Sequence, residues 1–221
     1  MIELIGLYLN QLPGRHALIA LLDDRLYGAW RDRHKSIRDE LAVKASLGGL
    51  LLLQRMGILE SLAYDEKGRP YIKDSNFDFN ITHTDRMVIG AFETPDLEKE
   101  LLSDVPPCRV GIDAESLDRI ASVRICPLAE RWFTEAEQEQ FLETPTDNTF
   151  LRIWTRKEAF VKWLGEGLRV MRRADTVIAH KTHGVKFSEY RVEDTLITLC
   201  HRAEAAPPAE LHLLTFAELF D

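Results

Sequence analysis

A short apolar segment, residues 109–113, leads directly into two acidic residues that stand two positions apart, Asp113 and Glu115. Its branched aliphatic side chains predict a buried β-strand. Side chains at positions i and i+2 of a strand point to the same face of a sheet, so the two carboxylates are expected to project together. Adjacent carboxylates repel each other unless a divalent cation holds them, and a set of oxygen ligands suits Mg²⁺. The alternative is a pair of carboxylates solvated at a sheet edge.

A third acidic residue, Glu158, stands in segment 150–164, which predicts an amphipathic helix. Glu158 and Lys162 are i,i+4 neighbours on its more polar side. Lys157 falls inside the apolar arc, where a lysine must reach solvent or meet an anion. Exposed Glu–Lys pairs are common and weak, so a solvated surface pair with a snorkelling lysine is the alternative. The apolar face is formed by Ile153, Phe160 and Leu164.

Five short motifs follow one another along the chain and together resemble the signature of the 4'-phosphopantetheinyl transferases. Their order and spacing match the larger, surfactin-synthetase-activator (Sfp-type) branch of that family. Each motif alone is a weak signal, whereas five in this order are a strong one. The motifs are G-R-P at 68–70, F-N-I-T-H-T at 79–84, G-I-D-A-E at 111–115, W-F-T-E-A-E at 132–137 and W-T-R-K-E-A-F-V-K at 154–162.

The resemblance implies an α+β fold with two pseudo-twofold-related halves in one chain. Each half would have a small, mainly antiparallel sheet packed on a long helix. Residues 1–103 would form the N-terminal half, with contacts to the phosphates and adenine of coenzyme A, and residues 104–221 the C-terminal half, with the metal site and catalytic residues. The Sfp-type branch is monomeric, and a chain of 221 residues is too long for the smaller, trimeric branch.

The implied activity is the Mg²⁺-dependent transfer of 4'-phosphopantetheine from coenzyme A to a serine of an apo acyl or peptidyl carrier protein, which releases 3',5'-ADP. The resemblance assigns the metal to Asp113, Glu115 and Glu158, against the pyrophosphate. Lys162 is expected to reach the phosphate and stabilise the departing oxygen. Lys157 is expected to supply a second cation beside the pyrophosphate, which would explain its place on the apolar arc.

Glu137 is expected to accept the proton of the attacking serine, unless a water on the metal does so. A structural explanation competes with this one. Thr134 precedes a predicted helix and Glu137 stands three residues later, which is the pattern of a capping box.

Four residues of the N-terminal half are expected to contact coenzyme A. His83 matches a phosphate contact of the family, with a backbone-bonded turn histidine as the alternative. Arg69 replaces the usual lysine and keeps its charge, and Thr82 replaces the usual serine and keeps its hydroxyl. Lys44 lies where the family has a cation for the 3'-phosphate, and is equally well explained as the polar edge of the apolar helix 40–56.

The formal net charge is −8, from 28 Lys and Arg against 36 Asp and Glu, which disfavours nucleic acid as a partner. It would also repel acidic carrier proteins globally, so docking must use local patches. Three cysteines, an odd number without metal spacing, suggest reduced thiols. Residues 1–9 look like a strand rather than a signal peptide, and the aliphatic stretch 47–53 is too short to cross a bilayer. We therefore expect a cytoplasmic monomer with no membrane contact.

Two other functions remain open. A Mg²⁺-dependent hydrolase of the coenzyme A pyrophosphate would use the same carboxylates without a protein acceptor. A non-catalytic module that binds carrier proteins would keep the fold and lose the chemistry.

The predicted elements complete the picture. A polar, proline-bounded linker is expected at 94–107 and a turn at 68–70. Helices are predicted at 17–30, 40–56, 119–132 (interrupted near Pro127), 134–142 and 150–164. Strands are predicted at 2–9, 77–81, 87–92, 109–113, 176–179, 185–192, 195–202 and 211–216.

Overall fold

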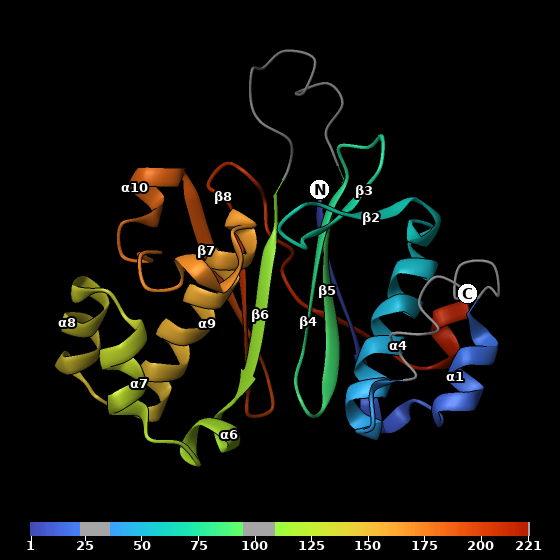
Figure 1. Ribbon diagram of the computed structural model, residues 1–221, viewed down its shortest axis with the longest axis horizontal. Coiled ribbons are helices and arrows are strands. Elements are labelled where there is room, and N and C mark those ends of the chain that lie inside the picture. The colour runs from blue at the N-terminus through green and yellow to red at the C-terminus, as the bar shows by residue number, and fades with distance from the viewer. Residues whose placement is uncertain (23–35, 95–108, 221) are drawn as a thin grey trace.

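Two small sheets stand edge to edge at the centre of the molecule, and each packs on one long helix (Figure 1). The computed structural model describes residues 1–22, 36–94 and 109–220. It has the α+β fold with two halves that the sequence predicts. The expected division between residues 103 and 104, and nearly all of the expected linker, lie outside the described residues, so the domain boundary stays a prediction.

The N-terminal half holds a four-stranded sheet in the order β4-β5-β1-β9. Strand β1 pairs antiparallel with β5, from Ile2 opposite Glu93 to Tyr8 opposite Met87, and β4 pairs antiparallel with β5. Its strands are β1 (Ile2–Tyr8), β4 (Asp78–His83), β5 (Met87–Glu93) and β9 (His212–Leu214), with the hairpin β2 (Leu62–Tyr64) and β3 (Pro70–Ile72) beside them. Its helices are η1 (Leu9–Gln11), α1 (Arg15–Leu21), α4 (Glu40–Arg55), η2 (Leu59–Ser61) and η4 (Ala217–Phe220).

The C-terminal half holds a three-stranded antiparallel sheet in the order β6-β8-β7. The strands are β6 (Gly111–Ser116), β7 (Val185–Val192) and β8 (Thr195–Arg202). The helices are α6 (Leu117–Ala121), α7 (Ile125–Trp132), α8 (Glu135–Glu143), α9 (Asp147–Leu164), η3 (Gly167–Val170) and α10 (Ala179–His183).

Helix α4 is the apolar helix that the sequence predicts. Asp39 caps its N-terminus by accepting a hydrogen bond from Ala42 N at 2.7 Å, and Gly57 follows its end with a φ of 68°. The run from Leu50 to Leu53 is buried, together with much of the rest of the helix. The helix therefore forms the core of the N-terminal half.

The two halves also share a core. Side chains from β1 and β5 pack in one cluster with side chains from β6 and β8. Burial of this shared face holds the two sheets against each other. The cluster includes Ile2, Leu4, Met87, Ile89, Ala91, Val110, Ile112, Ala114, Ile197 and Leu199.

The C-terminal segment returns to the N-terminal half. Strand β9 pairs in parallel with β1, with Gly6 opposite Leu213, and Leu219 of η4 packs in the core around α4. In Figure 1 this red segment lies beside α4 and α1. The sequence predicts a strand here, but not its place in the first sheet.

Three local predictions need correction. Residues 176–179 form no strand, since they lead into α10, which begins at Ala179. The helix predicted over 119–132 is two helices, α6 and α7, and Pro127 lies in the first turn of α7, where it needs no hydrogen-bond donor. Helix α1 ends at Leu21, and most of the remainder of the helix predicted over 17–30 lies outside the described residues.

In the described part of the chain, no helix is both long and apolar enough to span a bilayer.

Gly111 allows α9 to pack directly on β6. A Cβ at this position would collide with the carbonyl oxygen of Ala159 and stand 2.5 Å from Trp163 N. Both groups belong to the backbone of α9, which has no room to move. The glycine that opens the G-I-D-A-E motif is thus needed for the approach of the helix that carries Glu158.

We predict that Gly111→Ala lowers the free energy of unfolding by about 3 kcal/mol or more, because the added methyl overpacks a backbone contact. Gly49→Ala is the matched control. Its Cβ would meet Ile81 Cγ2 at 3.6 Å, which is ordinary contact, so we expect a gain of up to about 1 kcal/mol from helix propensity. Urea unfolding followed by circular dichroism measures both, and equal stabilities would contradict the packing argument.

Candidate active site

The edges of the two sheets are joined by side chains, since β4 and β6 form no backbone ladder with each other. Asp78 Oδ2 accepts a hydrogen bond from Val110 N at 2.8 Å, and Asn80 Oδ1 accepts one from Ile112 N at 3.0 Å. Asp78 and Asn80 stand two apart on β4 and so face the same side of the strand. These two side chains accept the hydrogen bonds that the backbone of a neighbouring strand would otherwise accept.

The carbonyl groups of Val110, which directly precedes β6, and of Ile112 in β6 are bound in a similar way. Arg69 Nη2 donates to Val110 O at 3.1 Å, and Lys162 Nζ donates to Ile112 O at 2.9 Å. Arg69 also forms an ion pair with Asp78 at 2.6 Å. Burial nevertheless raises the pKa of Asp78, against the attraction of Arg69. We call the four side chains Arg69, Asp78, Asn80 and Lys162 the side-chain seam.

The seam fixes the strand that carries the acidic pair. Asp113 is 4% exposed, and its Oδ1 contacts Lys162 Nζ at 2.7 Å and Thr82 Oγ1 at 3.3 Å. Glu115 Oε1 forms an ion pair with Arg119 at 3.1 Å. The other carboxylate oxygens, Asp113 Oδ2 and Glu115 Oε2, are buried and have no hydrogen-bond partner among the described residues.

Glu158 of α9 is the third acidic residue of the site. Burial, and then the negative charge of Asp113, raise its pKa to about 7, although Lys162 acts in the opposite direction. Burial and the charge of Asp113 likewise raise the pKa of Glu115, against Arg119. The three carboxylates therefore feel one another's charge, as the sequence predicts.

The donor set fits a hard divalent cation, because it supplies carboxylate oxygens, two of which are buried without partners. The carboxylates do not yet converge on one point. In residues 1–22, 36–94 and 109–220, no three Asp, Glu, His or Cys side chains are arranged to hold a metal ion. Instead, the ammonium group of Lys162 neutralises Asp113.

His83 and Arg119 border this acidic cluster. Burial, and then the positive charges of Lys162 and Arg119, lower the pKa of His83, so its ring is neutral at pH 7. Arg119 is 67% exposed and lies on α6, four residues after Glu115. Arg119 was not among the expected site residues, although its i,i+4 spacing from Glu115 is typical of an ion pair on a helix.

A cavity of about 270 Å³ opens beside the seam. It is polar at Glu158 and Lys162 and apolar at Val161 and Leu168, which suits a ligand with both charged and apolar parts. A larger hollow of about 470 Å³ lies at the β1–β9 edge and is lined by none of the predicted site residues. The smaller cavity is lined by Lys67, Gly68, Arg69, Pro70, Asn80, Glu158, Val161, Lys162, Gly165, Gly167 and Leu168.

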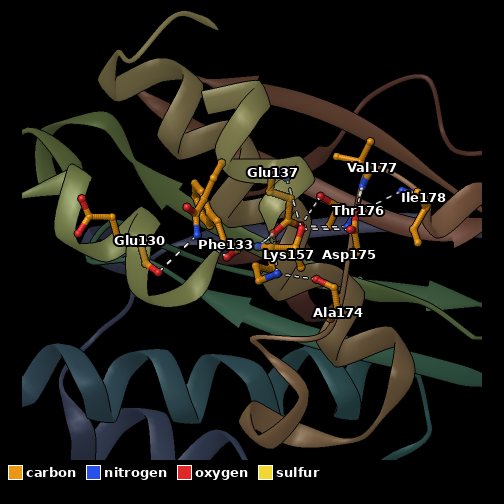
Figure 2. A network of polar contacts seen from close by, with 11 residues as sticks. Glu130, Phe133, Glu137, Lys157, Ala174, Asp175, Thr176, Val177 and Ile178 are labelled. Carbon is orange, nitrogen blue, oxygen red and sulfur yellow. Dashed lines mark hydrogen bonds and ion pairs between the residues drawn. The ribbon is translucent and has the colours of Figure 1, made fainter. Parts of the chain in front are cut away.

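Glu137 and Lys157 lie elsewhere, in a closed pair (Figure 2). Both side chains are 0% exposed, and Lys157 Nζ contacts Glu137 Oε2 at 2.6 Å. Lys157 also donates to Ala174 O, and Glu137 Oε1 accepts from Thr176 N at 2.9 Å. Burial lowers the pKa of Lys157, against the attraction of Glu137. The capping box with Thr134 is formed as the alternative explanation predicts.

This arrangement corrects two expectations. Lys157 does not face the cavity. The anion that pairs with this buried lysine is Glu137 and not a phosphate. Glu137 has no exposed oxygen to take a proton from a substrate, because Thr134, Lys157 and Thr176 occupy its carboxylate.

Lys44 also differs from its expected role. Its ammonium group donates to Leu12 O at 2.8 Å and Leu9 O at 3.4 Å, and it does not line the cavity beside the seam. The alternative explanation, a polar edge of the apolar helix, accounts for these contacts. The seam residue Arg69, by contrast, does line the cavity, and Thr82 contacts both Asp113 and Lys162.

Comparison with known proteins gives a consistent picture. Residues 109–215 match the family model of the 4'-phosphopantetheinyl transferase superfamily. The chain is 28% identical to the 4'-phosphopantetheinyl transferase ffp of Bacillus subtilis, over 68% of this chain and 60% of the relative. It is 28% identical to gsp of Aneurinibacillus migulanus, over 76% and 63% of the two chains, and 27% identical to Sfp of Bacillus subtilis (strain 168), over 68% and 60%. The chain thus spans less than two thirds of the length of these relatives, and the resemblance seen in the motifs is confirmed.

The raised pKa of Glu158 predicts a pH dependence of stability in buffer that contains EDTA. Its folded pKa of about 7 exceeds the ordinary value of 4.5, so the folded state binds the proton more tightly. Stability should fall as the pH rises through this window. Relative to Glu158→Gln, which cannot ionise, the wild type should lose about 7–14 °C in Tm between about pH 4 and pH 8. Parallel Tm profiles for the two proteins would show that Glu158 is not buried among like charges.

The closed pair predicts a large effect of Lys157→Met on stability. The variant leaves the buried carboxylate of Glu137 without its cation, which should lower the free energy of unfolding by about 3–5 kcal/mol. Lys67→Met is the control, because the Lys67–Glu166 pair is 54% and 43% exposed and should contribute less than about 1 kcal/mol. Urea titration of both variants measures the difference. A loss of the same size in each would contradict the closed pair.

Proposed function

We propose that this chain, whose C-terminal half matches the 4'-phosphopantetheinyl transferase superfamily, transfers the 4'-phosphopantetheine group of coenzyme A to a serine of an apo acyl or peptidyl carrier protein. One observation carries the proposal. Asp113 and Glu115 hold buried oxygens without partners among the described residues, and they act on Glu158, which has a pKa of about 7 and lines a cavity. Such strained acidic clusters are typical of catalytic sites.

Asp113, Glu115 and Glu158 are the residues that would hold Mg²⁺. When bound, the cation neutralises charge on the pyrophosphate and polarises the phosphate under attack. A bound cation would favour the ionised form of these three side chains. In the cation-free protein, burial and mutual repulsion oppose their ionisation.

Lys162 is suited to bind a phosphate. Its side chain is 29% exposed, lines the cavity and donates to Asp113, Ile112 O and Thr82. Its ammonium group would stabilise negative charge on the departing 3',5'-ADP. His83, neutral at pH 7, would contact a phosphate as a hydrogen-bond donor rather than as a cation. Arg69 would act at the same wall of the cavity, and Thr82 would act through its contacts with Asp113 and Lys162.

The reaction exchanges the phosphoanhydride bond of coenzyme A for a phosphoester bond to serine, and the proton of the serine hydroxyl passes to water. The serine oxygen attacks the β-phosphate and forms an O–P bond, while the bond from that phosphorus to the oxygen bridging to 3',5'-ADP breaks. Positioning and charge stabilisation dominate such transfers, which agrees with a site that is rich in charges. Glu137 is not part of this step, because it is buried in the pair with Lys157.

The carrier protein would dock through local contacts, because the chain has a formal net charge of −8 and would repel an acidic carrier globally. We propose that the protein acts as a cytoplasmic monomer that uses neither nucleic acid nor a membrane. The carrier serine has to reach the acidic cluster, and the exposed side of that cluster is formed by His83 and Arg119.

We predict that Asp113→Asn lowers the rate of carrier modification at least about 100-fold, because it removes one charge from the acidic cluster while keeping the side-chain shape. The rate is measured by mass spectrometry of an apo carrier protein incubated with coenzyme A and Mg²⁺. Asp118→Asn is the control, since Asp118 is 76% exposed and pairs with Arg86 outside the cavity.

The same assay distinguishes the alternatives. A mass gain of one phosphopantetheine on the carrier supports the transferase. Coenzyme A cleavage without a mass gain on any of several carriers would instead indicate a pyrophosphate hydrolase, and no turnover would indicate a binding module. Asp113→Asn with a wild-type rate would show that the acidic cluster is not the catalytic centre.

A further inference from the structure

Asn80 is held in one orientation by the side-chain seam. Its Oδ1 accepts a hydrogen bond from Ile112 N at 3.0 Å, and the residue is 7% exposed. A carboxamide has one acceptor oxygen and one amino group with two donors. Because the backbone N–H of Ile112 can only donate, the oxygen must face β6 and the amino group must face away from it.

The amino group of Asn80 is left without a use inside the protein. Asn80 lines the cavity beside the seam together with Glu158 and Lys162. Within the described residues, its Nδ2 has no hydrogen-bond partner, whereas its Oδ1 is occupied. The amino group is therefore accessible at the cavity wall, where a ligand oxygen would gain a hydrogen bond that the protein does not supply.

The neighbouring seam residue shows why position 80 is an asparagine. Asp78 stands two residues earlier and accepts from Val110 N in the same way, and the same oxygen also pairs with Arg69. An aspartate at position 80 would therefore hold Ile112 equally well. It would add a further carboxylate to the cavity wall that already carries Glu158, and it would offer no donor.

We propose that Asn80 is a further substrate-binding residue, whose amino group donates a hydrogen bond to an oxygen of coenzyme A in the cavity. The inference rests on the proposed function and adds a contact to it. The acceptor is a phosphate oxygen or an amide carbonyl oxygen, both of which coenzyme A carries. Asn80 would thus have two roles. Its oxygen holds the strand that carries Asp113 and Glu115, and its amino group binds coenzyme A.

Asn80→Asp separates these two roles, because it keeps the acceptor for Ile112 N and removes the donor. Titration calorimetry with coenzyme A should give a Kd about tenfold higher than that of the wild type, the usual loss for a hydrogen bond to a charged or buried acceptor. Asn148→Asp is the matched control: it makes the same substitution at an exposed residue that does not line the cavity, so the Kd for coenzyme A should change less than about twofold.

Two further titrations identify the cause of weaker binding. A second ligand, 3',5'-ADP, lacks the pantetheine and the β-phosphate, so a loss for coenzyme A alone places the acceptor on those parts, and a loss for both ligands places it on the nucleotide. A second variant, Asn80→Ala, removes the donor without adding a charge, so its Kd for coenzyme A should rise to a similar extent if the lost hydrogen bond rather than repulsion is the cause.

Each contrary result has a distinct meaning. If Asn80→Asp or Asn80→Ala binds coenzyme A as tightly as the wild type, Asn80 is only a structural part of the seam and this inference is wrong. If the wild type itself binds neither ligand, the proposed function fails, and the inference fails with it.

Discussion

The outward edge of β6 is the constraint on which the site depends. A strand at the edge of a sheet leaves backbone N–H and C=O groups that need partners when they are buried. Here no strand supplies them, and the side-chain seam does so at Val110 and Ile112. These partners come from three separate segments: β4, α9 and the hairpin turn that precedes β3. The seam therefore holds all three segments against the strand that carries Asp113.

This way of joining the halves leaves the space beside the strand open to a ligand. A ladder of backbone hydrogen bonds would have brought β4 and β6 close together along their length, with no need for Arg69 or Lys162 between them. The seam residues Arg69, Asn80 and Lys162 instead line a cavity. Two acid–base pairs show the contrast. The Glu137–Lys157 pair is closed, with its oxygens occupied, and stabilises the fold. The Asp113–Lys162 pair leaves one buried oxygen free for a cation.

Much of this arrangement follows from local rules in the sequence. The carboxylate pair of β6, the long helices and the capping box at Thr134 were predicted because strand alternation, helical periodicity and capping act over a few residues. The binding partner of Lys157 was not predictable in the same way. Periodicity places Lys157 on the apolar face of the helix but does not show that Glu137 lies next to it. The pairing of β9 with β1 joins the two ends of the chain, and no local pattern specifies such a contact. The seam was missed for the same reason, because Asn80 and Ile112 meet only in the folded chain.

The central claim is that Asp113, Glu115 and Glu158 share one divalent cation. A crystal grown with Mn²⁺ and coenzyme A tests it directly, because the anomalous scattering of manganese locates the ion without reference to any assumed site. The account predicts a peak about 2.0–2.3 Å from carboxylate oxygens of all three residues, with pyrophosphate oxygens completing the coordination. A peak elsewhere, or a bound coenzyme A with these three carboxylates turned away from any ion, would contradict it.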